Sequence, residues 1–338
     1  MVIIMSQNMN DTSPNLAIGI DIGGTNSEFG IINHRGEILI KGKIRTDGYD
    51  TVEPYINELY ENLMPIIDRY KKQGNIIGIG VGAPNANYYK GIIEYAPNLR
   101  WNGVVPLAKL VSEKFGLPCL LTNDANAAAL GEMTYGAARG LKDFIMITLG
   151  TGMGSGIVCN GQLVYGQDGY AGELGHTIIV RGGRKHWKTD LLGSLESYVS
   201  ATGVVLTALE MLDNSQEDSL LRQCNPGKIT SKVVYDCAMK GDKISLEVYR
   251  FTGQILGEAL ANFVMGTSPE AVVLFGGVMK AGPLFLQHAR EHLEMNVLPL
   301  YKNKVKILLS ELSEADAAIL GASTLVWDMP HQKKLEVS

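Results

Sequence analysis

The sequence predicts an α/β protein made of two related lobes. Two stretches repeat one order of elements: an apolar strand, a glycine-rich turn, a second strand, a polar turn and a third strand. The first copy begins at Leu16 and the second at Phe144. A repeat of this kind indicates two lobes of common design, each presenting one glycine-rich hairpin to a common cleft. We expect residues 16–122 and 313–330 to form the N-terminal lobe and residues 123–312 the C-terminal lobe.

Length and charge limit the class of protein. With 338 residues, of which 46% are hydrophobic, the chain can bury a substantial core and divide into two lobes. The formal net charge of -5 argues against nucleic acid as the main partner, because proteins that bind nucleic acid usually show a basic surface. The opening MVIIM is too short for a signal peptide or a membrane span. We therefore expect a cytoplasmic protein with no membrane partner, in which residues 1–15 form a disordered leader.

The cysteines give no sign of a metal or disulfide framework. No CxxC pair occurs among the four of them, which are Cys119, Cys159, Cys224 and Cys237. We expect reduced, structural thiols of the kind found in cytosolic proteins.

The N-terminal lobe opens with a meander of strands. Leu16–Ile20 has the continuous apolar character of a buried strand, and the turn Asp21–Asn26 (DIGGTN) follows it. The helix that comes after the meander keeps its apolar residues at the three-and-four spacing of one buried face. The later elements of this lobe are predicted in the order strand Phe29–Ile32, strand Glu37–Ile44, helix Thr51–Lys72, strand Ile76–Gly82, helix Pro106–Phe115 and strand Leu117–Leu121.

The stretch Thr122–Glu132 (TNDANAAALGE) places Asp124 where a strand gives way to an alanine-rich helix. Asn123 or Asp124 suits the N-cap, because a short polar side chain accepts the N–H groups of the first helical turn. The positive end of the helix should keep the Asp124 carboxylate ionised and facing the strand ends. Open α/β sheets bind ligands beyond those ends, where an ionised aspartate could take a proton from a substrate hydroxyl. A plain N-cap would account for the same residue.

The second copy of the pattern runs from the strand Phe144–Leu149 into the turn Gly150–Gly156 (GTGMGSG). Glycine-rich turns let backbone N–H groups approach an anion closely, because no Cβ stands in the way. Either turn alone is also compatible with an ordinary tight hairpin. Neither is a Walker A sequence or a dinucleotide fingerprint, since no Gly-Lys-Ser/Thr follows and the next element is a strand. Two such turns in one duplicated frame favour the binding of a polyphosphate.

The rest of the C-terminal lobe contains three further candidate sites. Glu173 and His176 lie in a glycine-rich loop suited to hydrogen-bonding a polyol, although a lone histidine is more often structural. Glu196 lies in the first turn of a helix begun at Ser194, where it either complements the helix dipole or binds a ligand. Gly276–Gly277 follows an apolar strand and either passes under a flat purine or forms a simple turn.

The remaining elements of this lobe follow from apolar periodicity, while residues 204–243 alternate between helical and polar character and indicate no role. The predicted order is strand Ile157–Asn160, strand Leu163–Gly166, helix Ser194–Thr202, helix Ile244–Gly266, strand Ala271–Phe275, helix Pro283–Met295, strand Val305–Leu309 and helix Ser313–Trp327.

Five motifs occur in order along the chain: DIGGTN, TNDANAAALGE, TLGTGMGSGI, GELGH and LFGGV. From about Leu16 to Trp327, the chain resembles the ROK family of sugar kinases and repressors. The resemblance implies an actin-like (ribonuclease H-like) two-lobed ATPase fold with duplicated α/β domains, in agreement with the repeat. It also implies the phosphorylation of hexoses or N-acetylhexosamines with ATP and Mg²⁺ as cofactors.

The resemblance assigns roles to individual residues. Asp124 matches the catalytic base, which deprotonates the sugar hydroxyl that attacks the γ-phosphate. Sugar-binding roles are implied for Asn123, Glu173, His176 and Glu196, and for Asn85 and Asn98 in loops that border the sugar pocket. ATP-binding roles are implied for the glycine-rich turns and the adenosine side, at Gly23, Gly24, Thr25, Asn26, Thr151, Gly152, Gly154, Gly276 and Gly277.

The sequence departs from the family at a zinc site. Members usually carry a CxCGxxGC zinc motif just before the glutamate that Glu196 matches, but here Trp187, Thr189 and Ser194 occupy the cysteine positions. Of the usual zinc ligands only His176 remains. We therefore expect no structural zinc, a loop held by packing, and a His176 ring whose orientation no metal fixes.

The implied reaction is glucokinase-like transfer of a phosphoryl group from MgATP to the 6-hydroxyl of a hexose. The sequence does not indicate whether glucose, N-acetylglucosamine or mannose is preferred. The alternative is a ROK-type sugar-binding regulator without kinase activity. Such regulators carry a winged helix-turn-helix before the first glycine-rich turn, whereas only a short leader precedes Asp21 here. Because relatives are often dimers or tetramers, we expect a homo-oligomer with a hexose as its substrate partner and no nucleic-acid partner.

Overall fold

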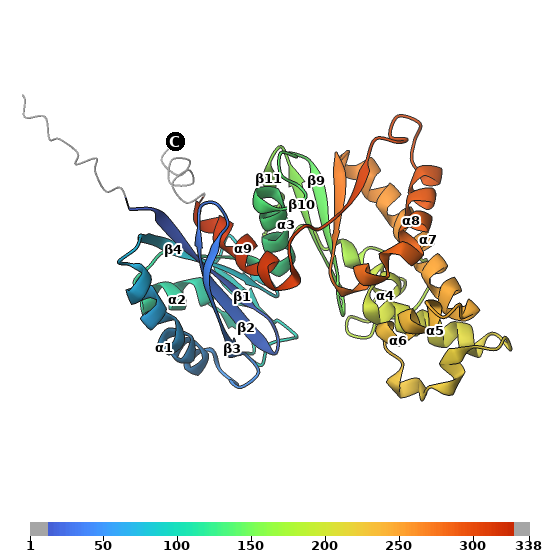
Figure 1. Ribbon diagram of the computed structural model, residues 1–338, viewed down its shortest axis with the longest axis horizontal. Coiled ribbons are helices and arrows are strands. Elements are labelled where there is room, and N and C mark those ends of the chain that lie inside the picture. Colours follow the sequence, from blue (N-terminus) through green and yellow to red (C-terminus); the bar gives the residue numbers. More distant parts are fainter. Residues whose placement is uncertain (1–12, 328–338) are drawn as a thin grey trace, which may run out of the picture. The chain divides into compact units, whose positions relative to one another are not determined.

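The computed structural model describes residues 13–327 of the chain (Figure 1). The chain divides into two compact units, one of Met1–Ala127 with Ala318–Ser338 and the other of Ala128–Ala317. Both divisions fall inside helices, namely α3 (Asp124–Tyr135) and α9 (Glu314–Trp327). Of the predicted leader, residues 1–12 lie outside the described residues.

The first unit is built on a five-stranded sheet in the order β3-β2-β1-β4-β8. Its three N-terminal strands pair antiparallel, while β4 and β8 run parallel to β1. The strands are β1 (Asn15–Ile22), β2 (Asn26–Asn33), β3 (Ile38–Arg45), β4 (Asn75–Ala83) and β8 (Cys119–Asn123). The predicted strands are confirmed, and β1 begins at Asn15, which the prediction had assigned to the leader.

The two faces of this sheet follow from the alternation of side chains along β1. Leu16, Ile18 and Ile20 are buried in one apolar cluster with α1 (Val52–Tyr70) and α2 (Leu107–Phe115). In Figure 1, α1 and α2 cover one face of the sheet and α9 lies on the other. The predicted helices at these positions are thereby confirmed.

Glycine allows α9 to lie unusually close to the sheet. A Cβ on Gly19 would collide with the carbonyl oxygen of Ile319, and one on Gly80 would collide with that of Ala322. Both glycines belong to central strands, and both colliding atoms are backbone atoms that cannot rotate away. The close approach therefore depends on the absence of a side chain at these two positions.

Substituting Gly80→Ala should lower the free energy of unfolding by roughly 1–3 kcal/mol, because the added methyl pushes α9 away from the sheet. Denaturant titration of the variant against the parent protein measures this change. Gly48→Ala is the matched control, since a Cβ there meets nothing within 4 Å and its stability should stay near that of the parent. Equal stability of the two variants would contradict the packing described here.

The second unit repeats the sheet of the first. Its order is β11-β10-β9-β12-β13, again with a three-stranded antiparallel meander and two strands parallel to the first strand of that meander. The strands are β9 (Phe144–Leu149), β10 (Met153–Cys159), β11 (Gln162–Leu163), β12 (Ala271–Phe275) and β13 (Lys306–Leu309). The duplication predicted from the sequence is confirmed. The second turn is shorter than predicted, because Met153–Gly156 already belongs to β10, and β11 ends before Val164.

Helices cover both faces of this second sheet. Ile145, Ile147 and Leu149 are buried with α5 (Ala201–Asp213), α7 (Lys243–Thr267) and α8 (Gly282–Asn296). The alternate residues Phe144 and Met146 are buried with Ala128 and Ala129 of α3. The stretch 204–243, which the sequence left without a role, supplies Val204 and Val234 to the core and so has a packing function.

The remaining elements are short. They are the small sheet β5 (Ala86–Asn87), β6 (Ile92–Glu94) and β7 (Val104–Val105), the helices α4 (Glu196–Val199) and α6 (Ser231–Ala238), and the 3-10 helices η1 (Leu174–His176), η2 (Leu220–Gln223), η3 (Pro226–Lys228) and η4 (Gly277–Ala281). All four cysteines are free. Between residues 13 and 327, no helix combines the length and apolarity needed to cross a membrane.

Candidate active site

Three parallel strands of the first unit end side by side and bring two aspartates together. Asp21 of β1 pairs with Gly82 of β4, and the next residue of β4 pairs with Asn123 of β8. Asp124 follows at once as the first residue of α3. A Cβ on Gly82 would lie 3.9 Å from Oδ1 of Asp21 and 3.8 Å from the Cα of Asp124. Its nearest neighbour would be the Cβ of Ala127, at 3.1 Å, so glycine at position 82 lets the start of α3 pack closely against the strand ends.

Asp124 is held at the beginning of α3 by its backbone. The N–H of Ala125 donates to Oδ1 of Asn123 at 2.9 Å and to Oδ1 of Asp124 at 2.8 Å. The bond to Asn123, the residue before the helix, is an N-cap bond and confirms one of the two predicted alternatives. The Asp124 side chain is exposed, so it can meet a substrate.

Two opposing effects act on the charge of Asp124 at the helix start. The surrounding protein raises the pKa of Asp124 above its usual range, and the hydrogen bond from Ala125 offsets only part of that effect. Protein atoms replace part of the water that would stabilise the charged carboxylate, and the positive helix end does not compensate fully. Water at the exposed face limits the penalty. A carboxylate with a raised pKa is a stronger base than an ordinary aspartate.

Asp21 is a candidate functional residue that the sequence did not single out. Burial, followed by the charges of Asp124 and Glu28, raises the pKa of Asp21 to about 7. Two carboxylates at one site resist simultaneous ionisation, so the pair retains a proton at a pH where isolated aspartates are charged. A carboxylate at the end of the first strand, directly before a glycine-rich turn, was the available sequence signal.

The raised pKa of Asp21 predicts a loss of stability as pH rises. Between its ordinary value of 3.8 and about 7, the folded protein keeps a proton that the unfolded chain has released. In this window, the contribution of Asp21 to the free energy of unfolding should fall with increasing pH, by up to about 1.4 kcal/mol per pH unit. Denaturant titrations at several pH values should show this slope in the parent protein and a shallower one in Asp21→Asn. Asp68→Asn, on the exposed side of α1, is the control; an unchanged slope in Asp21→Asn would contradict the shift.

The first glycine-rich turn presents two unpaired backbone donors. The N–H of Gly23 donates to the carbonyl of Asn26 at 3.0 Å, and the carbonyl of Thr25 accepts from Thr46 at 2.9 Å. The N–H groups of Gly24 and Thr25 have no acceptor within residues 13–327. Adjacent unpaired N–H groups in a turn form a site for an anion such as phosphate.

A network of buried hydroxyl groups lies next to this turn. The Tyr55 hydroxyl donates to Oγ of Ser27 at 2.8 Å, and Oγ of Ser27 lies 2.7 Å from Oγ1 of Thr46. All three residues are buried; Tyr55 belongs to α1, Ser27 to β2, and Thr46 directly follows β3. The network ties the start of β2 to α1 and to Thr46, whose N–H also donates to the carbonyl of Thr25 in the turn, so the turn has a defined shape before any ligand binds.

The two predicted sugar-binding asparagines of this unit differ in their surroundings. Asn98 lies against the first turn, because a Cβ on Gly24 would approach the carbonyl oxygen of Asn98 to 2.7 Å. The side-chain amide of Asn85 instead donates to the carbonyls of Glu94 and Tyr95 at 3.0 and 3.3 Å. Asn85 therefore holds its own loop together, and its φ of 52° suits an asparagine.

The second glycine-rich turn is also closed by a backbone hydrogen bond, over a shorter span than the first. The N–H of Gly150 donates to the carbonyl of Gly152 at 3.0 Å. The N–H of Gly154 donates to Oγ1 of Thr148 at 3.1 Å, so this predicted phosphate-binding donor already has a partner in the strand pair. The N–H groups of Thr151 and Gly152 lack acceptors among the residues the structure covers. Within the described residues, each of the two turns thus presents two adjacent unpaired donors.

Gly276 lies beside this second turn. β12 runs parallel to β9, and a Cβ on Gly276 would approach the carbonyl oxygen of Leu149 to 2.5 Å. Its φ of 104° also excludes most side chains. Gly277 is exposed, and a Cβ there meets nothing within 4 Å. The close approach at Gly276 brings two of the predicted nucleotide-binding elements together at one edge of the sheet.

The predicted sugar-binding residues of the second unit converge on Met153. The backbone N–H of Met153 donates to Oε2 of Glu196 at 2.5 Å. A Cβ on Gly175, in η1, would lie 2.8 Å from the carbonyl oxygen of Met153. The loop that carries Glu173 and His176 is therefore fixed against β10, next to the carboxylate of Glu196.

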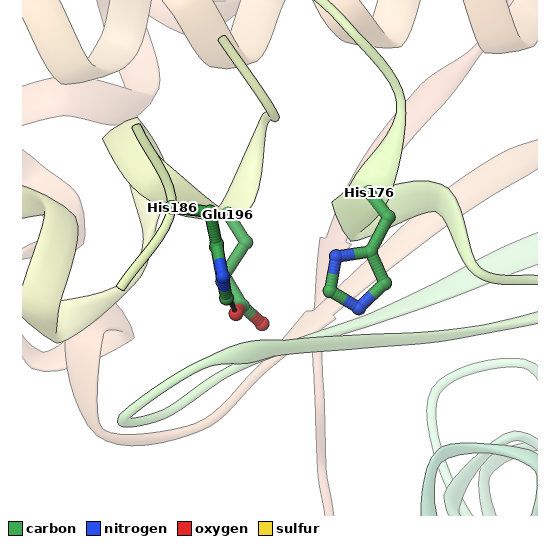
Figure 2. A group of neighbouring side chains, drawn as sticks. All are labelled: His176, His186 and Glu196. Atoms are coloured by element: carbon green, nitrogen blue, oxygen red, sulfur yellow. Dashed lines mark hydrogen bonds and ion pairs between the residues drawn. The ribbon is translucent and has the colours of Figure 1, made fainter. Parts of the chain in front are cut away.

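Figure 2 shows that Glu196 lies beside a second histidine, His186, with His176 facing them from η1. Ligand atoms of these three residues lie within 4.8 Å of one another. Nδ1 of His176 is buried without a hydrogen-bond partner in residues 13–327, and its Nε2 is 3.8 Å from Glu173. The sequence missed His186, because nothing in the segment RKHWKT indicates where its ring points.

Comparison with known proteins decides the family. The family model described as the ROK family matches residues 17–329. The chain belongs to the ROK family. The fold is the actin-like ATPase fold of ROK sugar kinases, as the sequence predicted.

Individual ROK relatives cover most of the chain. A glucokinase of Halalkalibacterium halodurans is 35% identical over 91% of this chain and 94% of its own length. The crystal structure of a ROK family glucokinase from Streptomyces griseus, in complex with glucose and AMPPNP, superposes with a TM-score of 0.74 at 30% identity, covering 92% of this chain and 98% of that one. A xylose repressor of Caldicellulosiruptor bescii is 28% identical over 91% of this chain and 77% of the repressor. The ROK family thus contains both kinases and repressors similar to this protein.

Proposed function

We propose that this protein transfers the γ-phosphoryl group of MgATP to the 6-hydroxyl of a hexose, with Asp124 as the general base. The observation that carries the proposal is the placement of Asp124: an exposed carboxylate at the ends of three parallel strands, beside a second acid and with a raised pKa. A base of this kind accepts a hydroxyl proton as the oxygen attacks phosphorus. The similarity to two proteins described as glucokinases supports the same reaction class.

The glycine-rich turns are the proposed phosphate-binding elements. Each offers two adjacent N–H groups without acceptors in the described part of the chain, at Gly24 and Thr25 in one unit and at Thr151 and Gly152 in the other. Backbone donors of this kind bind phosphate oxygens and stabilise negative charge during transfer. The approach of Gly276 to the second turn makes that edge the proposed adenosine side.

The proposed hexose contacts combine donors and acceptors. In the first unit, Asn123 lies directly beside the base and Asn98 lies against the first turn. In the second unit, Glu173, His176 and Glu196 lie near Met153, the first residue of β10 after the turn. A sugar hydroxyl both donates and accepts, so neighbouring carboxylate and imidazole groups can bind it in a defined orientation.

The acids of the first unit fit a magnesium ion. Mg²⁺ prefers carboxylate oxygens and is commonly bound through one or two of them together with substrate phosphates. The charge of Asp124 contributes to the raised pKa of Asp21, so a cation at this edge would relieve an existing repulsion. Asp21 is the residue we assign to hold Mg²⁺, which when bound neutralises charge on the phosphates.

Replacing Asp124→Asn tests the central assignment. The amide cannot take the hydroxyl proton, so kcat for hexose phosphorylation should fall by about 10²–10⁴-fold. The dissociation constant for the hexose, measured by calorimetry, should change little because the amide keeps the size and hydrogen-bonding reach of the acid. Glu113→Gln, exposed on α2, is the control and should retain full activity. Near-normal turnover in Asp124→Asn would remove Asp124 from its role.

One assay identifies the preferred hexose and also tests the alternative function, that of a sugar-binding regulator. ADP release is measured with glucose, N-acetylglucosamine, mannose and xylose as acceptors. We expect turnover with a hexose and none with xylose, which lacks the 6-hydroxyl. Because a xylose repressor is among the relatives, the alternative is a sugar-binding regulator. Tight binding of a sugar with no ADP release from any of the four would favour the regulator.

A further inference from the structure

His186 forms a hydrogen bond that fixes the carboxylate of Glu196. Its side chain is buried, with 1% exposed, and its Nε2 lies 2.6 Å from Oε1 of Glu196. Its Nδ1 accepts the backbone N–H groups of Lys188 and Thr189, each at 3.1 Å. A ring nitrogen that accepts carries no proton, so the proton of the neutral ring is on Nε2. His186 therefore donates to Glu196.

Both oxygens of Glu196 are thus held by the protein. His186 donates to Oε1, and the backbone N–H of Met153 donates to Oε2 at 2.5 Å. Gly152 makes room for this arrangement, since a Cβ there would lie 2.6 Å from Oε2. Each carboxylate oxygen accepts more than one hydrogen bond, so Glu196 can still bind a hydroxyl group.

The geometry at His186 does not fit a zinc ion. Two ligands bound to one tetrahedral zinc at 2.0–2.1 Å are about 3.3 Å apart. The 2.6 Å between Nε2 of His186 and Oε1 of Glu196 is a hydrogen-bond distance instead. A metal on Nε2 would also require the ring proton to move to Nδ1, which already accepts two N–H groups.

Arg184 anchors the segment around His186 to neighbouring helices. Arg184, with 8% of its side chain exposed, precedes His186 by two residues and lies over the ring of Tyr198, at 4.5 Å from the ring centroid. All five of its N–H donors are used, toward the Ser197 and Gly203 carbonyls, Oγ1 of Thr207 and both carboxylate oxygens of Glu210. These contacts hold the segment on α4 and α5 and so keep His186 in place.

We propose that His186 is a positioning residue for Glu196, and that this hydrogen bond sets the carboxylate for sugar binding without a metal. The inference rests on the proposed function, in which Glu196 binds the hexose. His186 itself does not touch the substrate. It acts by holding Oε1 of Glu196, while Met153 holds Oε2.

Two substitutions separate the hydrogen bond from the packing. In His186→Gln, the amide nitrogen reaches the position of Nε2 and can still donate to Glu196. In His186→Asn, the shorter side chain keeps an acceptor for Lys188 and Thr189 but cannot reach Glu196. Both variants lose the ring and its stacking on Trp187, at a centroid distance of 4.2 Å. A decrease in melting temperature that both variants share reports the lost packing of the ring. A difference in melting temperature between the two variants reports the hydrogen bond that position 186 donates to Glu196.

The steady-state kinetics of the two variants test the proposal. His186→Asn should raise KM for the hexose about tenfold, because the Glu196 carboxylate loses the hydrogen-bond donor that holds its Oε1. KM for ATP and kcat should change much less. His186→Gln should stay within about threefold of the parent protein in KM for the hexose. Equal values of that KM in the two variants would overturn the positioning role.

A spectroscopic measurement keeps this test independent of the proposed function. Side-chain ¹⁵N NMR of the histidines, with His186→Gln for assignment, should show His186 as the Nε2–H tautomer. A proton on Nδ1, or one equivalent of zinc bound by the parent protein and lost in His186→Asn, would overturn the inference. If the parent protein phosphorylates no hexose, the proposed function fails, and the tautomer and zinc measurements still decide whether His186 holds Glu196.

Discussion

The parallel register of β1, β4 and β8 is the constraint on which the site of the first unit depends. It places the ends of the three strands abreast, so that Asp21, Gly82 and Asn123 meet at one edge and Asp124 follows at the helix start. Asp21 loses hydration there, and the charges of Asp124 and Glu28 add repulsion, which is why the pKa of Asp21 rises to about 7. A slip of one residue in any strand would turn these side chains to the opposite face. The chemistry of the acids is therefore a consequence of strand pairing.

The second unit uses the same architecture for a different purpose. Its sheet repeats the order and direction of pairing, and its turn also offers two adjacent N–H groups that find no acceptor in residues 13–327. Where the first unit places acids, the second places Gly276 against Leu149 and Glu196 against Met153. One duplicated frame thus provides two turns that we propose bind phosphate, while the residues around them differ: the proposed base lies beside the first turn, and carboxylate and imidazole groups lie beside the second.

Much of the fold was predictable because the repeated signals are local. Apolar runs such as Phe144–Leu149 and Ala271–Phe275 mark buried strands, and both were predicted with the bounds that the structure shows. The second turn is shorter than predicted. The glycines at 154 and 156 suggest a turn, but the structure places them in β10, where Met153 and Ser155 are buried. Composition alone does not show that alternation when the intervening residues are glycine.

The site was less predictable because its energetics depend on contacts between distant residues. The helix start at Asp124 could be predicted from TNDANAAALGE, but the pKa of Asp124 depends on the protein around it, and that effect exceeds the local dipole. The raised pKa of Asp21 depends on the register of three strands, which brings Asp124 close to it. His186 reaches Glu196 only because of the path of residues 185–195 and the anchorage of Arg184, neither of which has a periodic signature.

The central claim is that the strand ends of the first unit hold two electrostatically coupled aspartates. The most direct measurement is a pH titration of aspartate side-chain carboxyl ¹³C signals by NMR, assigned with variants at positions 21 and 124. The structure predicts one carboxyl that titrates near pH 7 and shifts when its neighbour is neutralised. If every aspartate titrates near the ordinary value of 3.8 and neither of the two responds to the other, the account of this site is wrong.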